Sequence, residues 1–394
     1  MCRAAVVVIL SVDMKPMTIW RNWSAVIALL ASAGGAGAHD ENARVIRFPD
    51  LPDYVTLVSD LHQHTVFSDG AVWPDIRVQE GVRDGVDVMA ITDHLEYQPH
   101  RDDIPHPDRN RSHQLAREAA GSDIMVIPGA EVTRGMPPGH LNAVFITDAN
   151  RLLIDDPVDA LREAKAQGAF IYWNHPSWAS QAPDGIARLT EMHHRLIAEG
   201  LLHGIEVVNE FTYADEALQI ALDHDLTIMG TSDIHGLIDW EYNRHPHQHR
   251  PVTLVFARER TPAAVKAALL AGRTVVWYGE TLIGREEWMQ ALLAASLTVE
   301  AAGFVADSSV LNLVLSNRSD ADLALRNTSD LTFYNLPDTF RVPAQASTEL
   351  QVKTSPLAGA DVVTLAFEVL NAVTAPGEHP VVERLVSMND GPAP

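Results

Sequence analysis

Two histidines separated by a single residue, His62 and His64, begin the part of this chain best suited to chemistry. An apolar run at residues 54–61 that is typical of a buried β-strand leads directly into them. Residues two apart on a strand point to the same face, so the two imidazoles lie side by side. Asp69 follows five residues after His64, in a Ser-Asp-Gly turn. Two imidazoles and a carboxylate form half of a site for a divalent metal ion.

A His-x-His pair alone is weak evidence, because strands carry such pairs by chance. Other apolar runs of the chain also end on histidine or acidic residues. In an α/β barrel the catalytic groups sit at the C-terminal tips of the strands, because the loops there build the active face. The residues in question are Asp93 and His94 after the run at 86–92, Glu131 at the end of 124–131, His175 after 169–174, and Asp233 and His235 after 226–231.

Helices are expected between these strands. Proline near the first turn and glycine just beyond the last turn mark helices at 73–85 and 156–168, and further helices are expected at 189–199 and 214–223. Strands at 141–146, which His140 precedes, and at 204–209 complete a set of seven. Alternation of strands and helices predicts a parallel sheet with crossover helices.

The ordered motifs resemble those of the PHP (polymerase and histidinol phosphatase) superfamily. The resemblance runs from about residue 57 to residue 277. It implies a protein of the α/β class with a distorted (β/α)7 barrel and a metal-dependent phosphoesterase activity. The matching residues are His62-x-His64-Thr65-x-x-Ser68-Asp69-Gly70, Ile91-Thr92-Asp93-His94, Glu131, Gly139-His140, Asn174-His175-Pro176 and Asp233-x-His235.

The resemblance also implies a set of metal ligands for two or three divalent ions. Glu131 would bridge two of them, and Asp69 stands where some relatives carry histidine. An N/O ligand set suits zinc, manganese or iron. The first ion would be held by His62, His64, Glu131 and Asp233, the second by Glu131, His140 and His175, and the third by Asp69, His94 and His235.

The predicted reaction is hydrolysis of small phosphate esters, phosphodiesters above all, by a hydroxide activated on this cluster. Glu131, Asp233 and Asp93 are the candidate catalytic residues, although Asp93 could instead only orient a neighbouring ligand. Arg101, Arg134 and Arg244 are candidates for binding the phosphate. Two alternatives are a phosphomonoesterase resembling the histidinol-phosphate phosphatases and a non-catalytic secreted protein that binds metal or another ligand.

Composition limits the partners. Among 394 residues, 29 are basic and 52 are acidic, which gives a formal net charge of -23. A nucleic-acid duplex or an anionic membrane surface would be repelled by such a chain. We therefore expect a small-molecule substrate, whose negative charge is met locally by bound metal ions. The sequence does not indicate an oligomeric state.

The N-terminus has the order of a secretion signal: Arg21, an apolar stretch at 23–33 and an Ala-Gly-Ala site that ends at Ala38. The apolar stretch is short for a membrane span, so we expect cleavage, no stable membrane anchor, and a periplasmic or secreted protein. A translation start at Met14 or Met17 is our hypothesis for the residues before it. The single cysteine, Cys2, lies in this segment, so every metal ligand of the mature chain must be His, Asp or Glu.

These features predict three segments: a signal peptide at 1–38, the metallophosphoesterase barrel at 39–290, and a C-terminal domain at 295–394. The last has short alternating runs separated by turn residues, which is typical of a small β-sandwich. Its one histidine, His379, suggests no chemistry. Polar loops at 95–110 and 237–250 are expected to set specificity. The second loop includes the run His245-Pro246-His247-Gln248-His249, which no carboxylate frames.

Overall fold

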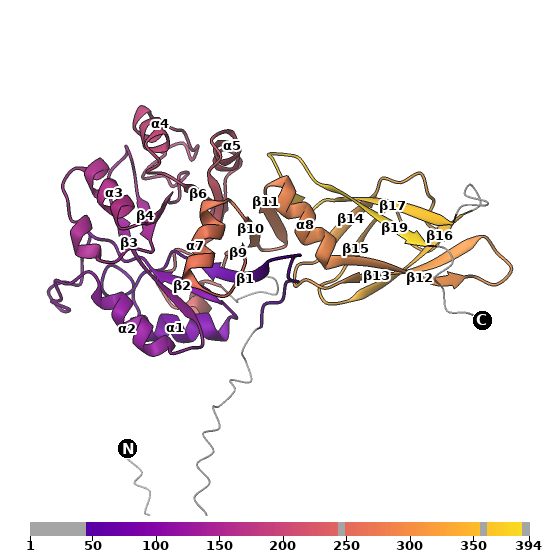
Figure 1. Cartoon of the computed structure of the whole chain (residues 1–394), viewed down its shortest axis with the longest axis horizontal. Coiled ribbons are helices and arrows are strands. Elements are labelled where there is room, and N and C mark those ends of the chain that lie inside the picture. The colour runs from indigo at the N-terminus through magenta and orange to yellow at the C-terminus, as the bar shows by residue number, and fades with distance from the viewer. Residues whose placement is uncertain (1–44, 243–248, 355–360, 388–394) are drawn as a thin grey trace, which may run out of the picture. The chain divides into compact units, whose positions relative to one another are not determined.

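A computed structural model describes residues 45–242, 249–354 and 361–387 (Figure 1). The first compact unit of the chain, residues 1–39, lies outside the described residues, and with it the predicted signal peptide. The second unit, residues 40–394, contains a large sheet followed by two smaller ones. No helix in the described part of the chain combines the length and the apolarity needed to cross a bilayer.

The large sheet has twelve strands within the described residues, in the order β18-β11-β10-β9-β1-β2-β3-β4-β5-β6-β7, with β8 paired to β6. All seven strands predicted for the barrel are present. The strands are β1 (Val55–Asp60), β2 (Val88–Ile91), β3 (Met125–Val132), β4 (Leu141–Val144), β5 (Phe170–Trp173), β6 (Gly204–Asn209), β7 (Thr212–Tyr213), β8 (Thr227–Thr231), β9 (Val252–Ala257), β10 (Thr274–Tyr278), β11 (Thr281–Gly284) and β18 (Ala372–Val373).

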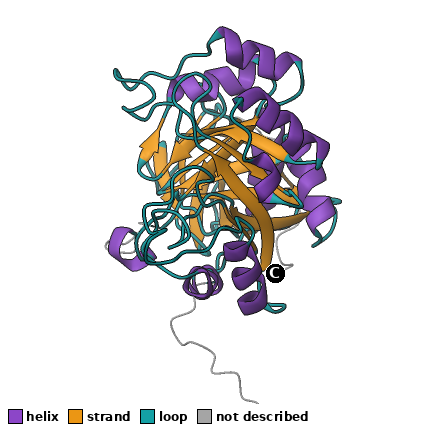
Figure 2. Ribbon diagram, turned by 90° about the vertical axis from the view of Figure 1, so that its left-hand side faces the viewer, coloured by secondary structure: helices purple, strands orange, loops and turns teal. Residues whose placement is uncertain are grey.

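Helices surround these strands (Figure 2). Two of them, at 74–83 and 157–166, begin with the predicted proline. Before the second, the Asp156 carboxylate accepts hydrogen bonds from the Val158 and Asp159 backbone N–H groups. The helices are α1 (Pro74–Arg83), α2 (Arg111–Ala120), α3 (Pro157–Ala166), α4 (Glu191–Ala198), α5 (Asp215–Asp223), α6 (Ile238–Glu241), α7 (Pro262–Leu270) and α8 (Glu286–Ser296), with a 3-10 turn, η1 (Ala149–Leu152).

The sheet is mixed, so the prediction of a wholly parallel sheet was wrong. Strands β1, β2 and β3 are parallel, but β4 runs antiparallel to both β3 and β5. The physical reason is the connection at 133–140, which contains no crossover helix and turns the chain straight back. Beyond β1, strands β9, β10 and β11 also alternate in direction. The start of β4 therefore lies at the same edge as the ends of β3 and β5.

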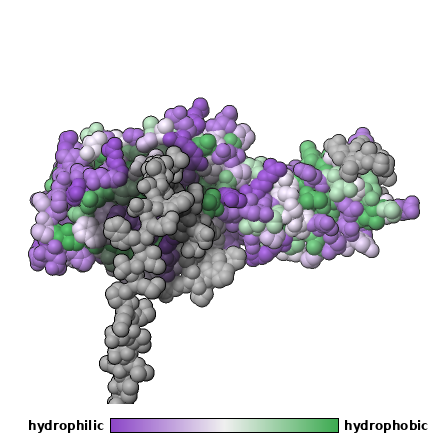
Figure 3. All heavy atoms as spheres, turned by 90° about the horizontal axis from the view of Figure 1, so that it is seen from below, coloured by the Kyte–Doolittle hydropathy of each residue, from purple (hydrophilic) through white to green (hydrophobic). Residues whose placement is uncertain are grey.

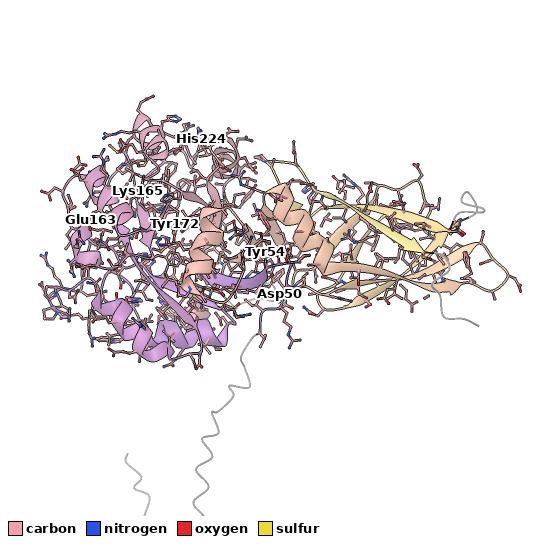
Figure 4. All side chains as sticks on the ribbon, in the orientation of Figure 1. Asp50, Tyr54, Glu163, Lys165, Tyr172 and His224 are labelled. Carbon is pink, nitrogen blue, oxygen red and sulfur yellow. The ribbon has the colours of Figure 1, made fainter. Side chains whose placement is uncertain are left out.

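The sheet curls so that the end of β8 meets the end of β1. The Asp233 N–H donates to the His62 carbonyl at 2.9 Å, and the His64 N–H donates to the Ile234 carbonyl at 3.1 Å. The interior is closed by large side chains such as Tyr172 on β5 (Figure 4). Its hydroxyl donates to the Leu61 carbonyl and accepts a hydrogen bond from the side chain of Asn142. These contacts fix the segment that carries the two leading histidines.

The C-terminal residues form the predicted β-sandwich. One sheet has the order β12-β13-β16 and the other β15-β14-β17-β19. Side chains alternate between buried and exposed along β13 and β17, as expected when one face of each strand meets the core. No helix occurs in the described parts of 297–387. The strands are β12 (Leu297–Phe304), β13 (Val310–Asn317), β14 (Leu323–Asn327), β15 (Thr339–Val342), β16 (Ser347–Lys353), β17 (Val362–Val369) and β19 (Val381–Ser387).

Among the coloured residues of Figure 3, hydrophilic side chains are interspersed with small apolar patches. Patches of this kind are ordinary for a folded protein in water and indicate no special surface. The polar groups that call for an explanation are buried instead, at the ends of the barrel strands.

Candidate metal centre

All nine predicted ligands gather at one edge of the curled sheet. His140 joins the others although it precedes its strand, because β4 is antiparallel and starts at that edge. Four overlapping groups place their ligand atoms within 4.8 Å of one another. These groups are His62, His64 and Asp233; His62, Glu131 and His175; His94, Glu131 and His140; and His64, Asp69, His94 and His235.

Three of the atoms predicted to hold the first ion, from His62, His64 and Asp233, have the spacing of ligands around one tetrahedral ion. Asp233 Oδ1 lies 3.1 Å from His62 Nε2 and 3.0 Å from His64 Nε2, and the two Nε2 atoms are 3.1 Å apart. Glu131 Oε2 lies 3.7 and 3.5 Å from the same two nitrogens. Ligand atoms at about 2.0–2.1 Å from a tetrahedral ion would be about 3.3 Å from one another. The atoms of His62, His64 and Asp233 therefore fit an ion between them, and Glu131 Oε2 lies close to the two imidazoles.

Glu131 presents its two oxygens to different groups. While Oε2 faces His62 and His64, Oε1 lies 2.9 Å from His140 Nδ1 and 3.6 Å from His175 Nε2. Two cations close together need an anion between them, and a carboxylate with this orientation can serve both. The third predicted set also converges: Asp69 Oδ1 is 3.3 Å from His235 Nε2, and Asp69 Oδ2 is 3.5 Å from His94 Nε2.

Three carboxylate oxygens of this cluster are buried without a hydrogen-bond partner: Asp69 Oδ1, Glu131 Oε2 and Asp233 Oδ1. Each lies near imidazole nitrogens, but in no geometry that makes a hydrogen bond. A buried acceptor left unpaired costs roughly 1–3 kcal/mol, and more when it is charged, so such atoms are rare in folded proteins. Three of them pointing into one cluster are the arrangement that divalent cations satisfy.

The electrostatics of the cluster favour ionised carboxylates. Burial alone would raise the pKa of the Asp233 and Glu131 carboxyl groups, but the surrounding imidazoles outweigh it and hold both pKa values well below the usual range. Burial likewise opposes a charge on His94, yet Glu131 and Asp69 raise its pKa to about 10. The pKa of His64 is lowered to about 4 by burial and by His235 and His94. A metal ion must displace the imidazole protons when it binds, so the affinity of the cluster for metal ions rises with pH.

Comparison with known proteins gives the same assignment. The chain is 39% identical to a two-domain protein from Bacteroides vulgatus that is described as containing a predicted PHP-like metal-dependent phosphoesterase. The match covers 87% of this chain and 98% of the other, with a TM-score of 0.81. The chain belongs to the PHP-like metal-dependent phosphoesterases. This confirms the resemblance read from the sequence.

More distant matches add little to this assignment. A proposed metal-dependent phosphoesterase from Bifidobacterium adolescentis is 19% identical to the present chain, with a TM-score of 0.34. The match covers 45% of the present chain and 88% of the Bifidobacterium chain. An amidohydrolase from Chromobacterium violaceum is 18% identical over 45% and 87%, with the same TM-score. A family model described as an Ig-like domain (DUF5001) matches residues 297–384, in the sandwich. No curated protein matches the chain.

Glu206 is a functional residue of the phosphoesterase that the sequence interpretation missed. It is fully buried on β6, and its Oε1 accepts a hydrogen bond from His62 Nδ1 at 2.8 Å and from the Thr231 hydroxyl at 2.6 Å. Its Oε2 accepts the His175 N–H at 2.7 Å. A carboxylate on the far nitrogen of a ligand histidine fixes the ring and increases its basicity. The available signal was one charged residue inside the apolar run Gly-Ile-Glu-Val-Val.

The contacts of Asp93 agree with a positioning role, which the sequence left open as its alternative. Its Oδ1 accepts hydrogen bonds from the Thr65 N–H and the Ser68 hydroxyl, and its Oδ2 accepts one from the Thr65 hydroxyl, all at 2.7 Å. These bonds hold the turn that carries Asp69. A side chain at Gly70 would meet the His64 and Thr65 backbone at 2.7 Å, so only glycine fits this turn.

Two ligand positions have strained backbones. His175 and Asp233 have positive φ values, 30° and 49°, which non-glycine residues rarely adopt. Such conformations cost about 1–3 kcal/mol each and persist where the surrounding structure enforces them, commonly at functional sites. Here each follows a strand, β5 or β8, and the turn brings the side chain back into the cluster.

Two of the three candidate phosphate-binding arginines, Arg134 and Arg101, do not line the cavity over the cluster. Arg134 is bonded to Glu96 and donates to the Ile154 carbonyl, and Arg101 is mostly exposed beside Asp102. Arg244 lies outside the described residues, as do His245 to Gln248. His249 is buried, with its ring against Trp277 and its nitrogens on the carbonyls of Arg250 and Gly279. It therefore has a structural role.

A cavity of about 170 Å³, counted as space open to the centres of water molecules, opens over the cluster. Three residues of its wall, Trp178, Asn209 and Glu210, were not singled out from the sequence. The Trp178 ring is 48% exposed and lies 5.1 Å from the ring of His175 and 5.6 Å from that of His140. Partial burial and the Asp233 charge raise the pKa of the Glu210 carboxyl. The lining residues are Asp69, His94, His140, His175, Trp178, Asn209, Glu210, Asp233 and His235.

Proposed function

We propose that the phosphoesterase hydrolyses small phosphodiesters in preference to phosphomonoesters. The observation that carries this proposal is the charge of the cavity wall, which has three carboxylates and, among its described residues, no lysine or arginine. A phosphomonoester carries about 1.5 to 2 negative charges at pH 7, because its second pKa is near 6. A diester carries one. Apart from the imidazoles that are predicted metal ligands, the described wall has no cationic side chain to hold the additional charge.

The nine residues of the cluster would hold two or three divalent ions, with Glu131 shared. Zinc, manganese and iron all suit the nitrogen and oxygen ligands of the groups described above. Divalent ions in such a site lower the pKa of a water molecule and neutralise charge that builds on the phosphoryl oxygens. The orphaned oxygens of Asp69, Glu131 and Asp233 are the support for this assignment.

Residues of the chain itself orient the metal ligands and supply a proton to the leaving group. Glu206 keeps the proton of His62 on Nδ1, so that Nε2 faces the cluster. Asp93 keeps Asp69 in place through its turn. Glu210 is the one carboxyl group of the described cavity wall that is not a predicted metal ligand, and we propose that it gives its proton to the departing alkoxide oxygen. No covalent intermediate with the protein is required.

The test is the ratio of kcat/KM for a chromogenic phosphodiester to kcat/KM for the matching monoester. Residues 39–394 would be reconstituted separately with manganese and with zinc. A ratio well above one supports the proposal. A ratio well below one makes the protein a phosphomonoesterase. Absence of turnover of either ester at full metal content would favour the non-catalytic alternative, a secreted metal- or ligand-binding protein.

Export from the cytoplasm is also a proposal. It is supported by the signal-like order of the first 38 residues. N-terminal sequencing of the protein recovered outside the cytoplasm tests it. A first residue at His39 agrees with the proposal, whereas recovery of the whole protein in the cytoplasm contradicts it.

A further inference from the structure

A second pocket adjoins the metal cavity of the phosphoesterase. Four residues line both: His175, Trp178, Asn209 and Glu210. A molecule whose phosphate lies in the cavity can therefore extend one of its organic groups into the pocket. The residues that line the pocket alone are Pro176, Ser177, Glu206, Val207, Thr212 and Ala214.

The pocket wall is part apolar and part polar. Pro176, Val207 and Ala214 are buried apolar residues, and the exposed ring of Trp178 faces the opening shared with the cavity. The Ser177 hydroxyl is buried and has no hydrogen-bond partner. Such a hydroxyl is satisfied only if something that enters the pocket bonds to it. The wall therefore suits a group with a hydrocarbon face and at least one hydrogen-bonding atom.

The charge of the pocket wall further limits which groups of a substrate can bind there. No lysine or arginine is among the described residues of the pocket wall, and two carboxylates, Glu206 and Glu210, are. Both oxygens of Glu206 already accept hydrogen bonds from protein groups. An anionic group would be placed next to these carboxylates with no lysine or arginine to compensate it, which is unfavourable in a partly buried site. The wall thus disfavours a second negative charge on the substrate.

The size of the pocket limits the occupant. Its volume is about 60 Å³ on the same measure as the cavity. A water molecule needs roughly 10–15 Å³ on this measure and about 30 Å³ of liquid, so the pocket holds roughly four to six waters, or about 120–180 Å³. That is the space of one six-membered ring or a short polyol. A whole nucleoside is too large.

We propose that this pocket binds one organic group of the phosphoester, and that this group is small, uncharged and polar, with its hydrocarbon face on Trp178 and a hydroxyl on Ser177. The inference rests on the proposed diester activity and gives that activity a substrate class: diesters of a short polyol or single-ring alcohol.

Four p-nitrophenyl phosphodiesters with different second groups test the proposal on the metal-loaded protein. The second groups are methyl, 2,3-dihydroxypropyl, 2-carboxyethyl and thymidine 5′. We expect kcat/KM for the dihydroxypropyl ester to exceed the values for the other three by about tenfold or more, the scale of one well-filled subsite. Equal values for the dihydroxypropyl and methyl esters, or a preference for the carboxyethyl or thymidine ester, would overturn the proposal.

Variants of residues that line only the pocket test whether the preference for the dihydroxypropyl ester arises there. Ala214→Leu fills the pocket and Ser177→Ala removes the free hydroxyl, and neither residue lines the metal cavity. Each should lower kcat/KM for the dihydroxypropyl ester by about five- to tenfold while the methyl ester is unaffected. Ser180→Ala, an exposed serine of the same loop, is the matched control and should change neither. Equal losses of kcat/KM on both esters would show damage to the metal cavity and would contradict binding of the dihydroxypropyl group in the pocket.

A binding measurement separates this proposal from the proposed function. Calorimetry would compare 2,3-dihydroxypropyl methylphosphonate with methyl methylphosphonate, both monoanions. Tighter binding of the first, lost in Ser177→Ala, supports the pocket even if no diester is turned over, in which case only the activity proposal fails. Turnover of the methyl ester with equal affinity for the two phosphonates leaves the activity standing and removes the pocket proposal.

Discussion

The barrel edge and the sandwich both bury polar side chains, but they do so in opposite ways. In the sandwich, the buried amide of Asn317 donates to the carbonyls of Ala321 and Val342 and accepts from Ser319. No buried side-chain polar atom of the sandwich's described residues lacks a partner. At the barrel edge, three carboxylate oxygens have none. In these two regions the protein itself thus satisfies the buried polar groups of the sandwich, but not the three oxygens of the predicted metal ligands.

His193 makes the same distinction among the histidines of the barrel. It is fully buried, like His62 and His64. Its Nδ1 accepts the Thr190 N–H, its Nε2 donates to the Pro138 carbonyl, and its ring lies 4.1 Å from that of Trp173. Both nitrogens are used by the protein, so His193 has nothing left for a metal ion. Burial of a histidine alone therefore does not identify a ligand.

The largest expected effect comes from removing a ligand. His64→Ala or Asp233→Ala deletes an atom of the tightest group, and we expect loss of bound metal and a fall in kcat/KM of at least about a thousandfold, since such ions contribute several kcal/mol. Metal content by elemental analysis and turnover in metal-free buffers check this. His194→Ala, an exposed histidine on α4, is the control. Retained turnover in either ligand variant would refute the assignment of the site.

The sandwich should respond to mutation through stability only. Phe367 is fully buried on β17, against the rings of Phe340 and Phe333. Phe367→Ala should lower the free energy of unfolding by about 3–5 kcal/mol, from lost burial and the cavity left behind. Denaturant unfolding measures this. Turnover at a temperature where the variant is folded should stay at the wild-type value, and a large loss there would give the sandwich a part in the site.

His193 should make stability depend on pH. Burial, which outweighs its bond to Pro138, lowers its pKa from 6.5 to about 4 in the folded protein. The unfolded chain therefore takes up a proton between these pH values that the folded one does not. The free energy of unfolding should fall by about 3 kcal/mol from pH 7 to pH 4 on this account. Comparison of the metal-free wild type with His193→Gln isolates the contribution, because the variant should lack that part of the pH dependence.

Glu210→Gln should slow the hydrolysis only of substrates whose leaving group must receive a proton. For an alkyl leaving group we expect kcat to fall by about a hundredfold, the usual scale of general acid catalysis, and for p-nitrophenolate to change little. Phosphorus NMR follows the alkyl ester, and absorbance follows the other. Glu199→Gln, on the surface of the barrel, is the control. Equal losses on both esters would assign Glu210 to binding.

Glu206→Gln should weaken metal binding with the smallest of these effects. The amide cannot accept all four hydrogen bonds that the carboxylate accepts, so the His62 ring loses its fixed orientation. We expect metal affinity to fall by about ten- to a hundredfold, as found for such supporting carboxylates. Competition with a chelating dye measures it. Unchanged affinity would mean that packing alone orients His62.

The sequence by itself predicted the residues that gather at the barrel edge and the two kinds of domain. His62, His64 and Asp233 stand at the tips of apolar runs, and the order of these motifs along the chain resembles the PHP pattern, which implied the ligand set. The sandwich was visible in alternating runs such as β17, because side-chain direction on a strand alternates with a fixed period. Motif order carries the first signal and local periodicity the second, and both can be read along the chain without tertiary information.

Only the tertiary structure decided the direction of β4, the supporting role of Glu206 and the pocket beside the metal cavity. Strand direction depends on how the connection at 133–140 turns, and the partner of Glu206 is 144 residues away, at His62. The pocket joins the segment after β5 to the segment between β6 and α5. Contacts between distant parts of a chain leave no periodic trace in it. They exist only once the sheet has curled and closed.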